Sequence, residues 1–172
     1  ADVIVGNVDP SLISGAKNLE LLQLNSAGAD LYIKAGVMPE GAVLANATGA
    51  YGLAVSEHML GLLVEHGFEI TDSEEDAEVI VINTCCFIHD AKEESIQNIL
   101  EMAKYRTAGS CKVLLVTGCM AERYRDEIIE EIPEVDAVLG TNSYDKILDA
   151  IQDVLGGDRF QEYADLKGLP KI

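Results

Sequence analysis

Cysteines are the side chains of this chain with the clearest capacity for chemistry, because a thiolate can bind iron. Four are present, at Cys85, Cys86, Cys111 and Cys119. Four cysteines in a chain of 172 residues do not form the pattern of a disulfide scaffold, so we expect a reducing, cytoplasmic setting. Loops at the carboxyl ends of neighbouring parallel strands can converge on one point, whereas Cys111 opens an apolar run and therefore lies at the far end of its strand.

A second candidate for chemistry is the turn at residues 46–51, which follows one apolar run and precedes a helical pattern. It is similar to the phosphate loop of flavodoxins, although Asn46 and Tyr51 replace the first and last hydroxyl residues of that loop. Backbone N–H groups at the start of a helix can bind a phosphate without any cation. Thr48 and Gly49 are therefore candidate FMN-binding residues. The aromatic side chains available to flank a flavin ring are Phe87, Tyr124 and Tyr144.

The elements that must position these residues form an alternating pattern of apolar runs and helical segments. The runs are nearly all apolar, which is typical of strands buried on both faces of a parallel sheet. Helices of crossover length are expected between them, and the clearest covers residues 90–104, where Ala91, Ile96 and Ile99 fall on one stripe. The expected strands cover residues 2–6, 19–24, 42–45, 68–71, 78–82, 112–116 and 137–139.

The chain is strongly acidic, with a formal net charge of −18 at pH 7. A charge of this size repels phosphate backbones and anionic membranes, so we expect neither nucleic acid nor a membrane as a partner. The apolar run at residues 60–64 is too short to span a bilayer, and we expect no secretory signal. The length fits one domain.

Three motifs in the second part of the chain resemble the N-terminal domain of radical-SAM methylthiotransferases, over about residues 65–157. They are Asn-Thr-Cys-Cys-Phe-Ile at 83–88, Asp-Ala-Lys-Glu-Glu-Ser-Ile at 90–96 and Gly-Cys-Met-Ala-Glu-Arg-Tyr at 118–124. The resemblance implies a 4Fe–4S cluster held by three cysteines from three loops at one sheet edge. Cys85 and Cys119 match the second and third of these, and are therefore the candidate metal ligands.

The same resemblance also shows what this chain lacks. The first cluster cysteine belongs to a Gly-Cys-Pro-like turn, where this chain has residues 46–49 without a cysteine. Cys86 is a poor substitute, because adjacent residues on an extended chain point in opposite directions. The radical-SAM motif Cys-x-x-x-Cys-x-x-Cys is absent, so we expect no methylthio transfer from this chain alone.

The first 64 residues resemble a different family, the substrate-binding domain of D-2-hydroxyacid dehydrogenases. The motif is Asn-Ala-Thr-Gly-Ala-Tyr-Gly at 46–52, continued by Ser-Glu-His-Met-Leu at 56–60. The resemblance implies a carboxylate-binding turn, and a small-residue turn before a helix can bind an anion on its own physical grounds. The candidate anion-binding residues are Ser26, Ala27 and Gly28. No Gly-x-Gly-x-x-Gly motif is present, so we expect no dehydrogenase activity.

Two resemblances meeting near residue 64 favour the hypothesis of an engineered or computed chimera. It predicts a single flavodoxin-like domain over residues 1–172: a three-layer, doubly wound, mostly parallel α/β sheet with additional N-terminal strands and a tail at 158–172. We expect the strand at 68–71 to insert between those at 19–24 and 42–45, with the latter beside 78–82. Displacement of the strand at 68–71, or exchange of segments between two chains, stays open.

The leading functional hypothesis is therefore a scaffold without native catalytic activity, and not an enzyme. We expect a monomer or a strand-exchanged homodimer. The alternative is an incomplete iron–sulfur module of the methylthiotransferase type, with Cys85 and Cys119 as ligands. A second alternative is a flavin or phosphate binder at the turn 46–51.

Overall fold

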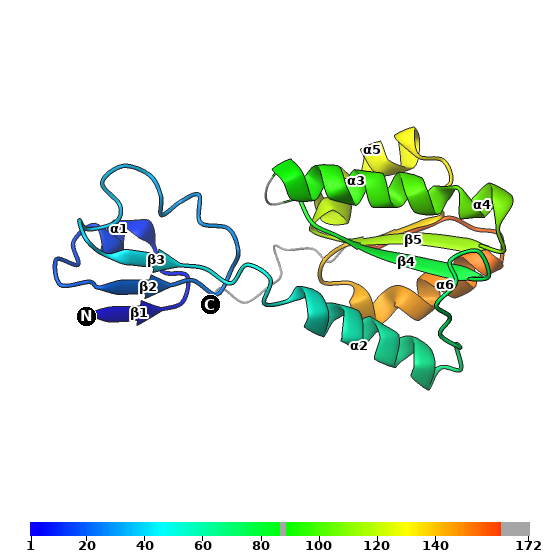
Figure 1. The fold of residues 1–172 in the computed structure, drawn as a ribbon, viewed down its shortest axis with the longest axis horizontal. Helices are drawn as coiled ribbons and strands as arrows, with labels where there is room; N and C mark the ends of the chain where they lie inside the picture. The colour runs from blue at the N-terminus through cyan, green and yellow to red at the C-terminus, as the bar shows by residue number, and fades with distance from the viewer. Residues whose placement is uncertain (87–88, 163–172) are drawn as a thin grey trace. The chain divides into compact units, whose positions relative to one another are not determined.

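The structure, a computed structural model, describes residues 1–86 and 89–162 of the chain (Figure 1). The chain divides into two compact units, Ala1–Val55 and Ser56–Ile172. Each unit has its own parallel sheet and its own hydrophobic cluster. The predicted α/β class with a three-layer arrangement of parallel strands and helices is confirmed. Phe87 of the predicted motif and residues 163–172 of the predicted tail lie outside the described residues.

The first unit is a three-stranded parallel sheet in the order β1-β2-β3. Its core is formed by side chains such as Ile13, Leu22 and Tyr32, and the Tyr32 hydroxyl donates a hydrogen bond to the Val8 carbonyl at 2.8 Å. The Asp9 carboxylate caps the short helix by accepting from a backbone N–H in its first turn, a usual role for Asp at this position. The elements are β1 (Val3–Val5), α1 (Pro10–Ile13), β2 (Leu21–Gln23) and β3 (Val43–Ala45).

The second unit is a four-stranded parallel sheet in the order β4-β5-β6-β7. All six residues of β5 are buried, as the all-apolar run predicts for a central strand covered on both faces. The strands are β4 (Val79–Thr84), β5 (Val113–Gly118), β6 (Ala137–Leu139) and β7 (Phe160–Glu162).

Helices cover both faces of this sheet, with α3 and α5 on one face and α2 and α6 on the other (Figure 1). The α3 and α5 face buries Ile99 and Ile128 against Leu114 and Val116 of β5. None of the helices within residues 1–86 and 89–162 has the length and apolar character to cross a bilayer. The helices are α2 (Gly52–Glu65), α3 (His89–Ala103), α4 (Tyr105–Ala108), α5 (Cys119–Glu131), the 3₁₀ helix η1 (Tyr144–Lys146) and α6 (Ile147–Leu155).

The predicted order of seven strands in one sheet is wrong. Within the described residues β3 pairs with β2 and β4 pairs with β5, so the strands form two sheets. The predicted strand at 68–71 does not form, because the Phe68 N–H bonds to the Leu63 carbonyl at 3.1 Å and closes the end of α2. Gly67 makes this closure possible by adopting a φ of +88°. The segment therefore ends a helix and does not begin a strand.

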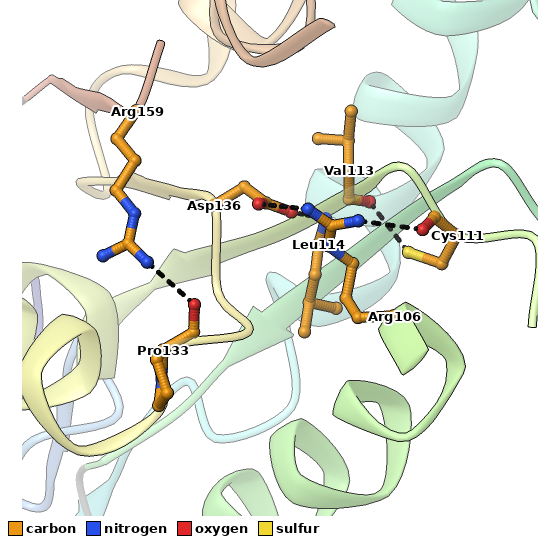
Figure 2. A network of polar contacts seen from close by, with 7 residues as sticks. All are labelled: Arg106, Cys111, Val113, Leu114, Pro133, Asp136 and Arg159. Atoms are coloured by element: carbon orange, nitrogen blue, oxygen red, sulfur yellow. Dashed lines mark hydrogen bonds and ion pairs between the residues drawn. The ribbon is translucent and has the colours of Figure 1, made fainter. Parts of the chain in front are cut away.

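A polar network holds the amino end of the second sheet together (Figure 2). The Asp136 carboxylate accepts from Arg106 Nη2 at 2.6 Å and from the Leu114 backbone N–H at 2.8 Å. Arg106 also donates through Nη1 to the Cys111 carbonyl at 3.1 Å. One ion pair thus joins α4, the start of β5 and the residue before β6. Because Asp136 is only 13% exposed, this pair is better shielded from water than the surface pairs of the chain.

We expect Asp136→Ala to lower the free energy of unfolding by about 2–3 kcal/mol, because it leaves a half-buried guanidinium and a backbone N–H without their acceptor. Urea unfolding of the variant and of the unchanged protein measures this difference. The matched control is Lys112→Gln, which removes the exposed ion pair with Glu78 at 2.5 Å and should change the stability by roughly 0.5 kcal/mol or less. Equal losses of stability in Asp136→Ala and Lys112→Gln would contradict the conclusion that the Arg106–Asp136 pair is the shielded one.

Candidate metal centre

The carboxyl ends of β4 and β5 bring two cysteines to one edge of the second sheet. Thr84, the last residue of β4, is in register with Gly118, the last residue of β5. Cys85 and Cys119 follow these two residues directly, so they leave the sheet side by side. The Cys119 thiol is close enough to the thiols of Cys85 and Cys86 for both to raise its pKa. The sequence prediction that these loops converge is consistent with this arrangement.

A close backbone approach fixes the two strand ends relative to each other. Gly118 has a φ of +98°, and a Cβ placed on it would lie 2.2 Å from the Thr84 carbonyl oxygen. Only glycine fits this position, for both reasons. The Thr84 hydroxyl donates to the Thr117 carbonyl at 2.5 Å and accepts from the Ala121 N–H at 3.4 Å. The end of β4 is thereby tied to the end of β5 and to the first turn of α5.

Helix α3 contributes a hydroxyl to the same edge. Ser95 is 7% exposed, and its Oγ accepts from the Cys85 N–H at 3.0 Å and donates to the Cys85 carbonyl at 2.9 Å. The Cys85 side chain itself is exposed. The backbone of this cysteine is therefore anchored while its thiol faces outward.

The electrostatic environment of the thiols combines burial with nearby cations. Burial raises the pKa of the Cys119 thiol, the Cys85 and Cys86 thiols raise it further, and Arg123 lowers it. Burial also raises the pKa of Cys86, against the lowering effect of Arg123 and Lys92. The Lys92 ammonium lies 3.9 Å from the centre of the Tyr124 ring, a cation–π distance. Burial is the largest effect at both thiols, so their pKa values lie above the ordinary value and the cations only reduce this shift.

The loop after β6 meets the same edge through α5. The Glu122 carboxylate accepts from the Thr141 N–H at 3.1 Å. Burial raises the pKa of Tyr144, and Cys119 and Glu122 raise it further, which places the phenol near both side chains. Three consecutive strand ends thus surround the thiols, as is usual for sites in parallel α/β sheets.

The fit of these residues to an iron–sulfur cluster is partial. Cys85 and Cys119 suit two thiolate positions, since they emerge from registered residues of neighbouring strands. A cluster requires more ligands than two. In the part of the chain that the structure describes, no group of three or more His, Cys, Asp or Glu side chains is arranged to hold a metal ion. The site is therefore an incomplete ligand set.

The other predicted binding residues lie in the first unit and stay predictions. In the turn at 46–51, the Thr48 N–H is already bonded to the Asn46 side chain at 3.3 Å, and Gly49 has a φ of +78°. The Ala27 carbonyl accepts from the Asn46 side-chain amide at 2.8 Å.

The predicted anion turn borders a hollow of about 460 Å³. The Ser26 hydroxyl there accepts from the Asn7 amide at 2.9 Å and donates to the Gly28 carbonyl at 3.1 Å. Asp9 and Asp30 also line this hollow. Two carboxylates favour a cationic or neutral occupant over an anion.

The sequence reasoning missed two residues of the second-unit site, Thr84 and Ser95. Both stand inside the quoted motifs, but they carry no metal-binding group. A signal for Ser95 was available, because it lies four residues from Ala91 and from Ile99 on the apolar stripe of α3. A hydroxyl on a buried stripe requires a partner, and here the partner is the Cys85 backbone.

Comparison with known proteins identifies the class of this thiol-bearing α/β unit. The model of the uncharacterized protein family UPF0004 matches residues 51–140, which is more than half of the chain, and the chain belongs to this family. The matched region contains both cysteine loops.

Named relatives are ribosomal protein uS12 methylthiotransferases RimO. The protein of Lachnoclostridium phytofermentans is 58% identical over 120 residues, which cover 70% of this chain and 27% of that protein. The protein of Acetivibrio thermocellus is 56% identical over 101 residues, covering 59% and 22%. That of Desulforamulus reducens is 49% identical over 115 residues, covering 66% and 26%. The chain thus spans about a quarter of the length of the curated relatives it matches.

These findings correct two predictions. The hypothesis of an engineered chimera without activity is wrong, because the family match runs without a break across residue 64 and the relatives are natural proteins. The prediction that the chain is not an enzyme is contradicted as well, since those relatives are methylthiotransferases. The resemblance of the second part to methylthiotransferases is confirmed, whereas these findings give no support to the dehydrogenase resemblance of the first 64 residues.

Burial predicts the order in which the cysteines react with iodoacetamide. We expect Cys85, which is exposed, to be alkylated first, and Cys111 to be alkylated last. Cys111 is buried, and burial raises the pKa of its thiol, so it presents little reactive thiolate. Peptide mass spectrometry after timed quenching measures the order. Early labelling of Cys111 in the folded protein would contradict the structure.

Proposed function

We propose that this chain is the N-terminal part of a methylthiotransferase that acts on ribosomal protein uS12. The observation that carries this proposal is the placement of Cys85 and Cys119 at registered strand ends inside the family match. Identity of 58% over 120 residues with a relative of that activity supports it. The methylthio transfer belongs to the full-length protein, since this chain lacks the radical-SAM cysteine motif.

In this role Cys85 and Cys119 supply two thiolate ligands for an iron–sulfur cluster. Such a cluster supplies redox-active iron. Arg123 reduces the upward pKa shift that burial gives the Cys119 thiol, and Ser95 and Thr84 hold the backbone around the two cysteines. The remaining ligands come from outside this pair of loops, because the pair by itself is incomplete.

The proposed partner is a protein. The net charge of −18 opposes nucleic acid and favours a basic protein surface. We propose a reducing cytoplasmic setting, in accord with four cysteines that are all free in the described residues. Light scattering on the purified chain distinguishes a monomer from a strand-exchanged homodimer.

Iron reconstitution tests the ligand role directly. We expect the chain, treated anaerobically with iron and sulfide and then desalted, to retain iron and to show thiolate-to-iron absorption. The Cys85→Ser, Cys119→Ser double variant should lose both the iron and the absorption. Cys111→Ala, which replaces a buried cysteine just before the amino end of β5, should keep them. A colourless, iron-free chain, or equal iron in the double variant, would refute the ligand role.

A segment exchange tests the enzymatic part of the proposal. In a hybrid protein, residues 51–140 of this chain replace the corresponding segment of the Lachnoclostridium phytofermentans relative. The rest of the hybrid is the sequence of that relative. We expect the hybrid to modify a uS12 peptide at a rate within about tenfold of the parent, and the hybrid with Cys119→Ser to be inactive. The mass of the peptide reports the transfer. A folded hybrid without activity would refute the proposal.

A further inference from the structure

Cys85 stands at a position that the sheet itself does not hold. The register of β4 with β5 ends at Thr84 and Gly118, so Cys85 is the first residue beyond the ladder. Its N–H and its carbonyl instead bond to a single atom, the Ser95 Oγ, at 3.0 Å and 2.9 Å. A hydroxyl can do this because it donates and accepts at once. Ser95 thus substitutes for the missing strand neighbour.

Cys119 depends in a similar way on Thr84. Cys119 is the first residue of α5, and the residue before it, Gly118, has no side chain to cap the helix. The Thr84 hydroxyl bonds to the Ala121 N–H and to the Thr117 carbonyl, so it caps α5 from the neighbouring strand. The turn that carries Cys119 is therefore fixed by a side chain of β4.

A contrast within the same strand pair suggests that these hydroxyls have a specific task. The Thr117 hydroxyl is fully buried on β5 and has no hydrogen-bond partner in the described structure. An apolar side chain of the same shape would serve the core at that position equally well. At Thr84 and Ser95 an apolar replacement would instead release the backbone next to a thiol.

We propose that Ser95 and Thr84 are positioning residues that set the mutual orientation of the Cys85 and Cys119 thiols. Neither hydroxyl is placed as a ligand; each acts through the backbone of a cysteine loop. The inference rests on the proposed function, in which this pair supplies two cluster ligands, and it identifies what prepares the pair for a metal.

The test measures thiol geometry without any metal. In a Cys86→Ala background, a short bismaleimide either bridges Cys85 and Cys119 or modifies them separately, and intact mass distinguishes the two products. We expect Ser95→Ala and Thr84→Val to lower the ratio of bridged to doubly modified protein by about five- to tenfold, the effect of losing roughly one net hydrogen bond. Ser95→Thr and Thr84→Ser retain the hydroxyl and should restore most of the ratio.

Thr117→Val is the matched control, since it removes an equally buried hydroxyl from the neighbouring strand. We expect it to leave the ratio unchanged. An unchanged ratio in Ser95→Ala and Thr84→Val, or an equal fall in Thr117→Val, would overturn the proposal. Amide hydrogen exchange at Cys85 gives a second measurement: faster exchange in Ser95→Ala than in Thr117→Val is expected, and equal exchange would also overturn it.

Cobalt titration separates this inference from the proposed function. We expect Co²⁺ to bind the Cys86→Ala protein with thiolate-to-cobalt absorption, and to bind Ser95→Ala about five- to tenfold more weakly. If the bridging ratio responds as expected but no variant binds Co²⁺, the ligand role fails and the positioning role stands. If Co²⁺ binds equally to all variants with equal bridging, the positioning role fails and the ligand role stands.

Discussion

The close approach of β4 and β5 at their carboxyl ends is the constraint on which the rest of the site depends. Gly118 passes so near the Thr84 carbonyl that no side chain fits between them. This contact fixes where β5 ends and where α5 begins, and therefore where Cys119 leaves the sheet. Cys85 is placed by the same register, because it follows the residue that makes the contact. Strand pairing thus decides where both cysteines leave the sheet.

Different kinds of polar group lie at the two ends of the second sheet. At the amino end, Arg106 and Asp136 close the sheet with a shielded ion pair. At the carboxyl end, neutral hydroxyls hold the backbone, and the charged groups Lys92 and Arg123 act on the thiols from a distance. The shielded ion pair thus lies at one edge and the proposed thiol site at the other, and sites in parallel α/β sheets usually lie at the carboxyl edge.

The chain belongs to the UPF0004 family, and its named relatives are methylthiotransferases. The match covers the two cysteine loops and begins at residue 51. The described residues bring two thiols to one sheet edge with their backbone anchored, and under the proposed function this pair supplies part of a cluster ligand set. The relatives are about four times as long as the matched segments, so further groups belong to the parts of such enzymes that this chain does not represent.

The sequence by itself determined the strands β4, β5 and β6 and the long helix α3 of the second unit. All-apolar runs indicated the buried strands β4 and β5, and the helical stripe indicated α3, because both signals are local and arise from burial periodicity. Cys85 and Cys119 were identified through the resemblance of residues 83–88 and 118–124 to methylthiotransferases, and the apolar runs placed both cysteines after strands. Tertiary structure alone decided that the strands form two sheets and that Ser95 binds the Cys85 backbone. Each of these depends on which backbone groups come within hydrogen-bonding distance after folding. That distance is set by segments far apart in the chain, so local residue patterns do not encode it.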